Sequence, residues 1–293
     1  MKPNYYDIPE PFFHREQARA AIIPIPYERT VSFGAGTGLG PEAILRASHQ
    51  VEFYDEFLGL EPYRAGIFSE PLGNPKTVSR LSPAKMIERY AAIVARHLDE
   101  GRFPIVLGGE HTVALAPFAA AIARHPDLHV LQFDAHADLR EQYEDDPYSH
   151  ACAARRMVER APVTQIGIRS YDKEQAAAYS TLPVKVLHAW EIRGGRDPLP
   201  FLEAKLGDPV YLTIDLDVFD LAEMPATGTP EPGGLSWHEV DRMLAWLFAH
   251  RRVIGLDVVE LAPLAGLHAP DFLAARLIYR AIGRRLGEGT LQP

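Results

Sequence analysis

The chain has 293 residues, 47% of them hydrophobic and 24% charged, which is an ordinary composition for a folded protein, and its length allows one α/β domain or two domains. Its net charge of −9 argues against nonspecific nucleic-acid binding and is compatible with a cationic ligand. With one cysteine, no secretory leader and no run of about 18 apolar residues, the sequence excludes an intrachain disulfide and predicts a cytoplasmic protein without a membrane span.

Short apolar runs recur along the chain and alternate with amphipathic segments. This alternation predicts a parallel sheet covered by helices, with strands that are buried on both faces. In chain order, the predicted strands are Ala20–Ile25, Phe103–Leu107, His129–Phe133, Val163–Ile168, Val184–Leu187, Val210–Ile214 and Val253–Val259.

Three amphipathic segments carry clear helix signals. Pro83–Glu100 has apolar residues at helical spacing and stops before a glycine. Ser236 and Glu239 form a capping box ahead of a second apolar face, and Asp271–Leu286 is the last predicted helix. We therefore predict one doubly wound α/β domain over residues 1–293, with a mainly parallel sheet flanked by helices. Ligands of such folds bind beyond the carboxyl ends of the strands.

Side chains that could bind a metal follow two of these predicted strands. After Phe103–Leu107, a Gly-Gly turn leads to His111, which taken alone is often no more than a turn. After His129–Phe133, Asp134, His136 and Asp138 alternate with alanines, and alternate side chains of an extended segment point to one side. The alternative, a solvated loop with helix-capping carboxylates, does not account for this strict alternation.

A third set, Asp215 and Asp217, ends the run Val210–Ile214. Two carboxylates on one side of a buried strand end raise each other's pKa, a penalty that a divalent cation removes. In isolation, one Asp could instead cap the next element while the other is exposed. The joint occurrence of the three sets favours a metal site.

The combined set of imidazoles and carboxylates contains no thiolate, which favours manganese or a similar ion over zinc. Six side chains exceed what one metal with an open position usually takes, so we predict two metals that share carboxylate bridges. The candidate ligands are His111, Asp134, His136, Asp138, Asp215 and Asp217.

Three segments, LGGEHTVALAPFAA, VLQFDAHAD and TIDLDVFDLAEMPATGTPEPGG, carry a resemblance to a known family. Together with GAGTGLGPEAILRAS before them and GLDVVELAP after them, they resemble the ureohydrolases, the family of arginases and agmatinases. The resemblance implies an arginase-like fold, two Mn²⁺ ions, release of urea from a guanidinium group, and a homo-oligomer, either a trimer or a hexamer. It also implies that one ion is held by His111, Asp134, Asp138 and Asp215 and the other by Asp134, His136, Asp215 and Asp217.

Three residues are expected to be catalytic, two of them implied by the same resemblance and the third, Asp138, by the mechanism. His150, in YSHACAARR, matches the histidine implicated in proton shuttling. Glu260, in DVVEL, matches the glutamate that grips the substrate guanidinium. Asp138 is the expected first proton carrier. Without the resemblance, His150 would be read as a histidine of a surface loop.

The segment between Asp138 and His150 bears on the substrate. It lacks the Gly-Asn-x-His-Gly pattern with which arginases read the α-carboxylate and α-amino group of arginine, and its SHA-x-x-x-RR ending resembles agmatinases. Acids stand there instead and would repel a carboxylate: Glu141, Glu144, Asp145 and Asp146. We predict agmatine, a small cationic guanidino compound, cleaved to putrescine and urea.

Other readings stay open. If Arg140, Arg155 or Arg156 neutralises the acidic loop, then guanidinobutyrate, arginine and aminopropylagmatine remain candidate substrates. A non-catalytic homologue that kept the metal site would bind guanidino compounds without releasing urea. A related hydrolase acting on formimino or acetyl-lysine groups would yield other products in place of urea.

Overall fold

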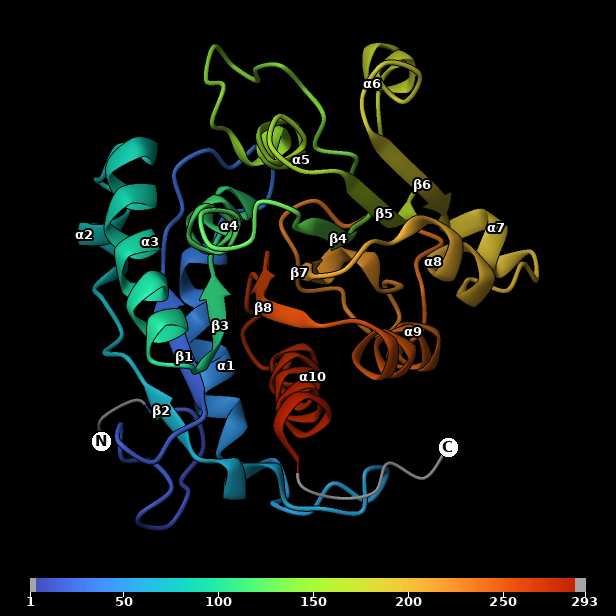
Figure 1. The fold of residues 1–293 in the computed structure, drawn as a ribbon. Coiled ribbons are helices and arrows are strands. Elements are labelled where there is room, and N and C mark those ends of the chain that lie inside the picture. The colour runs from blue at the N-terminus through green and yellow to red at the C-terminus, as the bar shows by residue number, and fades with distance from the viewer. Residues whose placement is uncertain (1–3, 288–293) are drawn as a thin grey trace.

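Eight parallel strands form one sheet in the order β2-β1-β3-β8-β7-β4-β5-β6, with helices on both faces (Figure 1). The computed structural model describes residues 4–287. The parallel sheet with helices on both faces confirms the predicted doubly wound α/β fold. The strands are β1 (Ala20–Ile25), β2 (Ile67–Ser69), β3 (Phe103–Gly108), β4 (His129–Phe133), β5 (Val163–Ile168), β6 (Val184–His188), β7 (Val210–Asp215) and β8 (Val253–Val259).

All of the predicted strands occur, with small changes at their ends. β3, β6 and β7 each extend one residue beyond the predicted run, to Gly108, His188 and Asp215, because these residues still pair with the neighbouring strand. β2 is absent from the prediction because three residues at the edge of the sheet are too short for a periodic pattern.

The helices begin and end close to their sequence signals. At α9, Ser236 and Glu239 form the predicted capping box, and at α3, Ser82 Oγ accepts the N–H of Lys85. α10 begins two residues earlier than predicted, with Pro270 in its first turn. The helices are α1 (Gly40–Ser48), α2 (Pro75–Val78), α3 (Pro83–Asp99), α4 (Leu115–Ile122), α5 (Ala153–Val158), α6 (Lys173–Ala178), α7 (Ala189–Arg193), α8 (Leu199–Lys205), α9 (Trp237–His250) and α10 (Ala269–Leu286).

Each face of the sheet is covered by its own helices. α1, α9 and α10 pack on one face, and α3, α4 and α5 pack on the other (Figure 1). Along β3, Ile105 and Leu107 belong to the same apolar cluster as Ile278 of α10, whereas Val106 belongs to the cluster of Met86 of α3. Because successive side chains point to opposite faces, a strand covered on both sides must be apolar throughout.

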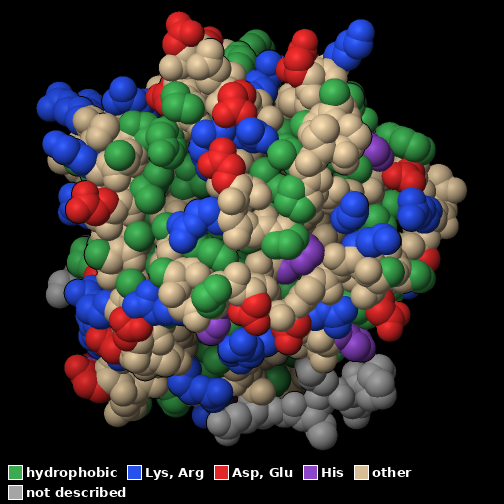
Figure 2. All heavy atoms as spheres, turned by 45° about the horizontal axis from the view of Figure 1, so that its top comes forward, with side chains coloured by type: hydrophobic (Ala, Val, Ile, Leu, Met, Phe, Trp, Pro, Cys, Tyr) green, Lys and Arg blue, Asp and Glu red, His purple; other side chains and the backbone are tan. Residues whose placement is uncertain are grey.

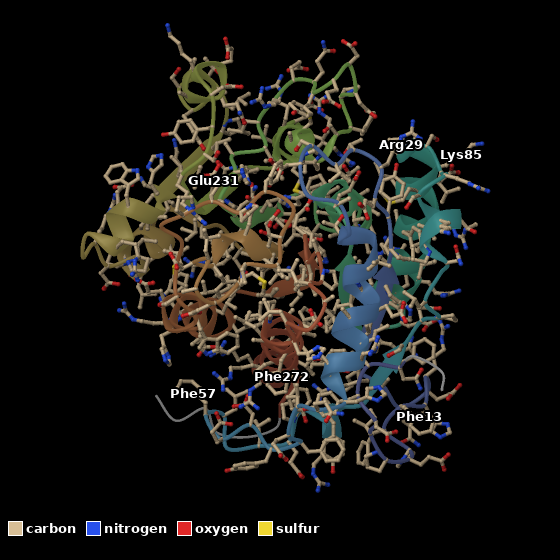
Figure 3. The ribbon with its side chains drawn as sticks, turned by 180° about the vertical axis from the view of Figure 1, so that it is seen from behind. Phe13, Arg29, Phe57, Lys85, Glu231 and Phe272 are labelled. Atoms are coloured by element: carbon tan, nitrogen blue, oxygen red, sulfur yellow. The ribbon has the colours of Figure 1, made fainter. Side chains whose placement is uncertain are left out.

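The centre of the sheet consists of β3, β8, β7 and β4. Because the strands are parallel, the segments that follow them meet at one end of the molecule. In Figure 3, Arg29, after β1, and Glu231, after β7, lie toward the top, whereas Phe13, Phe57 and Phe272 lie toward the bottom. Over residues 4–287, none of the helices has the length and apolarity that crossing a membrane would require.

Candidate functional site

The residues predicted to bind metal follow the central strands. His111 begins the short helix η3 (His111–Ala114) after β3, Asp134 comes directly after β4, and Asp215 is the last residue of β7. Within the described residues, two groups of side chains lie close enough to hold a metal ion. One group is His111, Asp134 and Asp215, and the other is Asp134, His136 and Asp217. Asp134 therefore belongs to both.

The surroundings of the His111 ring fit a metal ion in the first group. The Nδ1 atom of His111 is buried and has no hydrogen-bond partner. Carboxylate oxygens surround it at 3.1 Å from Asp134, 2.9 Å from Asp138 and 3.4 Å from Asp215. Donor atoms about 2.1 Å from an octahedral ion lie about 3 Å from one another, so this spacing suits a hard divalent cation.

The other nitrogen of the His111 ring belongs to a buried hydrogen-bond chain. His111 Nε2 lies 3.0 Å from Thr213 Oγ1, and the Thr213 hydroxyl donates to Asp257 at 2.8 Å. Tyr211 donates to the second oxygen of Asp257. Because the Thr213 hydroxyl gives its proton to Asp257, its oxygen accepts the Nε2–H of His111. In a neutral His111, the lone pair of Nδ1 then points toward three carboxylates. A cation between these donor atoms stabilises the arrangement.

The second group is held in place by backbone N–H groups. His136 Nδ1 lies 2.8 Å from Asp217 Oδ2 and 3.8 Å from Asp134 Oδ1. Asp217 Oδ1 accepts the N–H of Ala135 at 2.9 Å, and Asp134 Oδ1 accepts the N–H of His136 at 2.6 Å. Gln132 donates to Asp134 Oδ2 at 2.7 Å. These bonds orient the carboxylates before any cation is bound.

Asp215 combines the two roles that the sequence suggested for this pair of acids, which are capping the next element and facing the metal site. Its Oδ1 accepts the N–H of Asp217 at 2.9 Å and caps η5 (Leu216–Val218), while its Oδ2 faces His111. The two acids therefore sit in a tight turn at the strand end. Asp215 is grouped with the first set of donors only, so its implied bridging of two ions stays a prediction.

Asp138 and Glu260 have left-handed backbone conformations, with φ of +50° and +67°. This conformation costs a non-glycine residue about 1 kcal/mol, and such residues concentrate at functional sites. At Asp138 it ends the predicted extended alternation, and the side chain reaches His111 from a turn. Glu260 Oε1 accepts the N–H of His111 at 2.7 Å, which ties the end of β8 to the start of η3.

Crowding of buried acids shifts their pKa values. Burial and the neighbouring Asp217 raise the pKa of Asp134 to about 7 and that of Asp215 well above its ordinary value. Burial acts to lower the pKa of His136, but Asp217 raises it to about 10. Burial acts to raise the pKa of Asp217, yet His136 holds it at about 2. Such a cluster of buried carboxylates favours binding of divalent cations.

A cavity of about 160 Å³ opens onto both groups of donors. The predicted catalytic residues Asp138, His150 and Glu260 all line it. His150 begins η4 (His150–Cys152), in the loop that follows the second group. A further hollow of about 280 Å³ shares the lining residues Asp138 and Arg140 with this cavity and is also lined by Tyr171. The structure thus brings every predicted site residue to one place.

The loop acids predicted to repel a substrate carboxylate do not line this cavity. Glu141 pairs with Arg155 at 2.6 Å and with Arg156 at 3.1 Å. This agrees with the alternative, left open by the sequence, that these arginines neutralise the loop. Of the loop, Arg140 and Tyr143 line the cavity, and no acid does. Figure 2, in which this end of the molecule is turned forward, shows acidic and basic side chains next to one another on the surface.

Several residues of the site are missing from the sequence-based set. Thr30 and Ser32, in the loop after β1, contact the His150 ring. They follow an apolar strand, so the rule that located the other residues applies to them as well. Asp257 is the one charged residue in the otherwise apolar, fully buried strand β8, which is itself a signal of a buried polar role.

Comparisons with known proteins agree with this geometry. Residues 18–283 match the model of the arginase family. N(1)-aminopropylagmatine ureohydrolase of Synechocystis sp. is 36% identical, over 91% of this chain and 89% of that protein. Agmatinase of Bacillus anthracis is 36% identical, over 85% of each chain. The agmatine ureohydrolase of Thermoplasma volcanium superposes with a TM-score of 0.82 at 28% identity, covering 92% of this chain and 90% of that one.

Proposed function

Because this chain belongs to the arginase family and is a hydrolase acting on guanidino groups, we propose that it hydrolyses agmatine to putrescine and urea at a two-manganese centre. The observation that carries the proposal is one cavity lined both by members of the two metal-capable groups and by Glu260. In the reaction, the oxygen of a water molecule bonds to the guanidinium carbon. The bond from that carbon to the alkylated nitrogen breaks, and the amine leaves with a proton.

The donor set supports manganese or a similar hard ion, since it consists of carboxylates and imidazoles without a thiolate. When bound, a pair of divalent cations supplies an activated water at neutral pH and stabilises the negative charge that develops in the reaction. The proposed ligands of one ion are His111, Asp134, Asp138 and Asp215. Those of the other are Asp134, His136, Asp215 and Asp217.

Glu260 binds the substrate guanidinium in this proposal. Burial and the nearby charge of Glu110 raise the pKa of Glu260 well above its ordinary value. A guanidinium beside it provides the counter-charge that stabilises the ionised carboxylate, and charge-assisted hydrogen bonds of this kind are strong. Glu260 thus orients the carbon that is attacked.

Two residues move protons in this proposal. Asp138 lies next to the His111 ring and lines the cavity, so it accepts the proton that the attacking water loses. His150 lines the same cavity and exchanges protons between the leaving amine and solvent. An amine is a poor leaving group unless it is protonated, which is why a second proton carrier is needed.

The charge of the cavity wall supports an amine substrate over a guanidino acid. Arg140 is the only Lys or Arg among the described residues that line the cavity. Its guanidinium pairs with Asp172 at 2.7 Å and lies over the Tyr143 ring at 5.3 Å. Among the described lining residues, a substrate carboxylate therefore finds no Lys or Arg without a partner of its own, which disfavours arginine and guanidinobutyrate.

N(1)-aminopropylagmatine is the second candidate substrate. It shares the agmatine unit, and the adjoining hollow of about 280 Å³ offers room for a longer amine. The name of the Synechocystis relative supports the same choice.

The test is urea release by the manganese-loaded protein from agmatine, aminopropylagmatine, guanidinobutyrate and arginine. We expect the two agmatine compounds to have the highest kcat/KM. Arginine as the best substrate would overturn the choice of substrate class. Saturable binding of all four without urea would overturn the reaction and favour a non-catalytic homologue.

A further inference from the structure

Hydroxyl groups hold both nitrogens of the His150 ring. Thr30 Oγ1 lies 3.1 Å from Nδ1, and Ser32 Oγ lies 3.1 Å from Nε2. Thr30 Oγ1 also accepts the backbone N–H of His150 at 3.0 Å. The loop after β1 is therefore hydrogen-bonded to a residue that is 120 positions away in the chain.

A buried carboxylate supports this loop from the other side. Glu110 is 1% exposed, and its Oε2 accepts the backbone N–H groups of Arg29 and Thr30, each at 2.6 Å. Its Oε1 accepts the hydroxyl proton of Thr30 at 3.0 Å. Hydrogen bonds to a carboxylate are stronger than those to a neutral nitrogen, so the Thr30 proton stays on the side of Glu110.

These directions determine the tautomer of His150. A threonine hydroxyl has one proton to donate, and here Glu110 receives it. Thr30 Oγ1 can then only accept from His150 Nδ1, which must carry a proton. We propose that Glu110 and Thr30 are positioning residues that hold neutral His150 as its Nδ1–H tautomer and leave the Nε2 lone pair available to the cavity for proton transfer.

The other neighbours of the ring are compatible with this tautomer. Ser149 Oγ lies 3.3 Å from Nδ1 and can act as a second acceptor for its proton. Ser32, which also lines the cavity, can donate to the bare Nε2 in the resting state, so proton transfer to Nε2 requires this hydroxyl to rotate away. The Tyr143 ring meets the His150 ring edge-on at 5.9 Å and offers no competing acceptor in that contact. The inference rests on the proposed role of His150 as a proton carrier.

Two near-isosteric substitutions, Glu110→Gln and Thr30→Val, together with the control Thr30→Ser, separate the proposal from a general structural role. In Glu110→Gln, the amide oxygen takes over the two backbone N–H groups, so the amide NH₂ faces Thr30 and donates to it. The Thr30 hydroxyl is then free to donate to His150 Nδ1, and the proton of neutral His150 moves to Nε2. In Thr30→Val the acceptor is absent, whereas Thr30→Ser keeps it.

Neutron crystallography of the metal-loaded protein reads the tautomer directly. At alkaline pD, where the ring is neutral, we expect deuterium on Nδ1 and a bare Nε2. In Glu110→Gln we expect deuterium on Nε2. A bare Nδ1 in the unsubstituted protein, or an unchanged tautomer in Glu110→Gln, would overturn the proposal.

Kinetics supply a second readout. We expect Glu110→Gln and Thr30→Val to lower kcat for agmatine by about tenfold to a hundredfold, with KM changed less than about threefold, because only proton transfer is impaired. Thr30→Ser should restore most of kcat; equal losses in Thr30→Ser and Thr30→Val would contradict the proposal. If His150→Gln leaves kcat unchanged, the proton role of His150 fails, while the neutron result still decides the tautomer.

Discussion

His111 Nδ1 and Asp138 Oδ2 lie 2.9 Å apart, although the strands that precede them, β3 and β4, are separated in the sheet by β8 and β7. The contact spans the centre of the sheet at the ends of four adjacent strands. Asp215, the last residue of β7, and Glu260, which follows β8, also contact His111. The order of the strands in the sheet therefore brings the site residues together, and each of the four central strands is followed by or ends in one of them.

Asp134→Asn should remove both metal ions, because Asp134 is the residue common to the two donor groups. We expect the metal content after manganese loading and desalting to fall from about two ions per chain to less than one. Mass spectrometry of the metal in the purified protein measures this. Asp127→Asn, at an exposed position, is the matched control and should keep the full content. Two ions retained by Asp134→Asn would contradict the assignment.

Thr213→Val should weaken metal binding without removing a ligand. The Thr213 hydroxyl accepts from His111 Nε2 and donates to Asp257, so it holds the His111 ring in its orientation. Loss of such an outer hydrogen bond costs about tenfold to a hundredfold in metal affinity. Competition with a chelator of known affinity measures the change. Thr213→Ser keeps the hydroxyl and should bind nearly as tightly as the unsubstituted protein; if it binds as weakly as Thr213→Val, the hydroxyl is not the cause.

The double substitution Glu144→Gln with Asp145→Asn should change KM for agmatine less than about twofold. Both acids are exposed and neither lines the cavity.

Glu260→Gln, by contrast, should lower kcat/KM for agmatine about tenfold to a hundredfold, since a hydrogen bond to a charged group contributes about 1.5 to 3 kcal/mol. Urea assays over a range of agmatine concentrations compare the two. A large rise in KM for the loop variant would restore the acidic loop as a substrate-binding feature.

Stability should fall in mild acid partly through His129. Burial and the charge of Arg251 lower the pKa of His129 from 6.5 to about 4 in the folded protein, where Nδ1 accepts the N–H of Gly207. Between these values the unfolded chain binds the proton and the folded chain does not, so the free energy of unfolding decreases as pH falls. From pH 7 to pH 5 this contribution falls by about 2 kcal/mol.

His129→Asn keeps an acceptor near Gly207 and removes the titrating group. Urea unfolding of both proteins at pH 7 and pH 5, with the same metal concentration, isolates the effect. We expect the unsubstituted protein to lose about 2 kcal/mol more than His129→Asn. Equal losses would show that His129 does not titrate in this way.

The local pattern of residues predicts most of the fold and the identity of the metal-capable residues. Continuous apolar runs mark the buried strands because both faces of a parallel sheet are covered, as Ile105 and Val106 show on β3. Polar residues directly after those runs mark the site because parallel strands end at one edge. Both signals depend only on neighbours along the chain.

Other features depend on contacts between distant segments and were decided by the tertiary structure. Glu141 cannot be known to pair with Arg155 and Arg156 until the loop is folded onto α5. The grip of Thr30 on His150 likewise arises only because β1 and the loop after β4 end at the same edge of the sheet. Composition and periodicity carry no information on which distant side chains meet. Strand order and loop path determine those meetings, and with them the charge of the cavity wall.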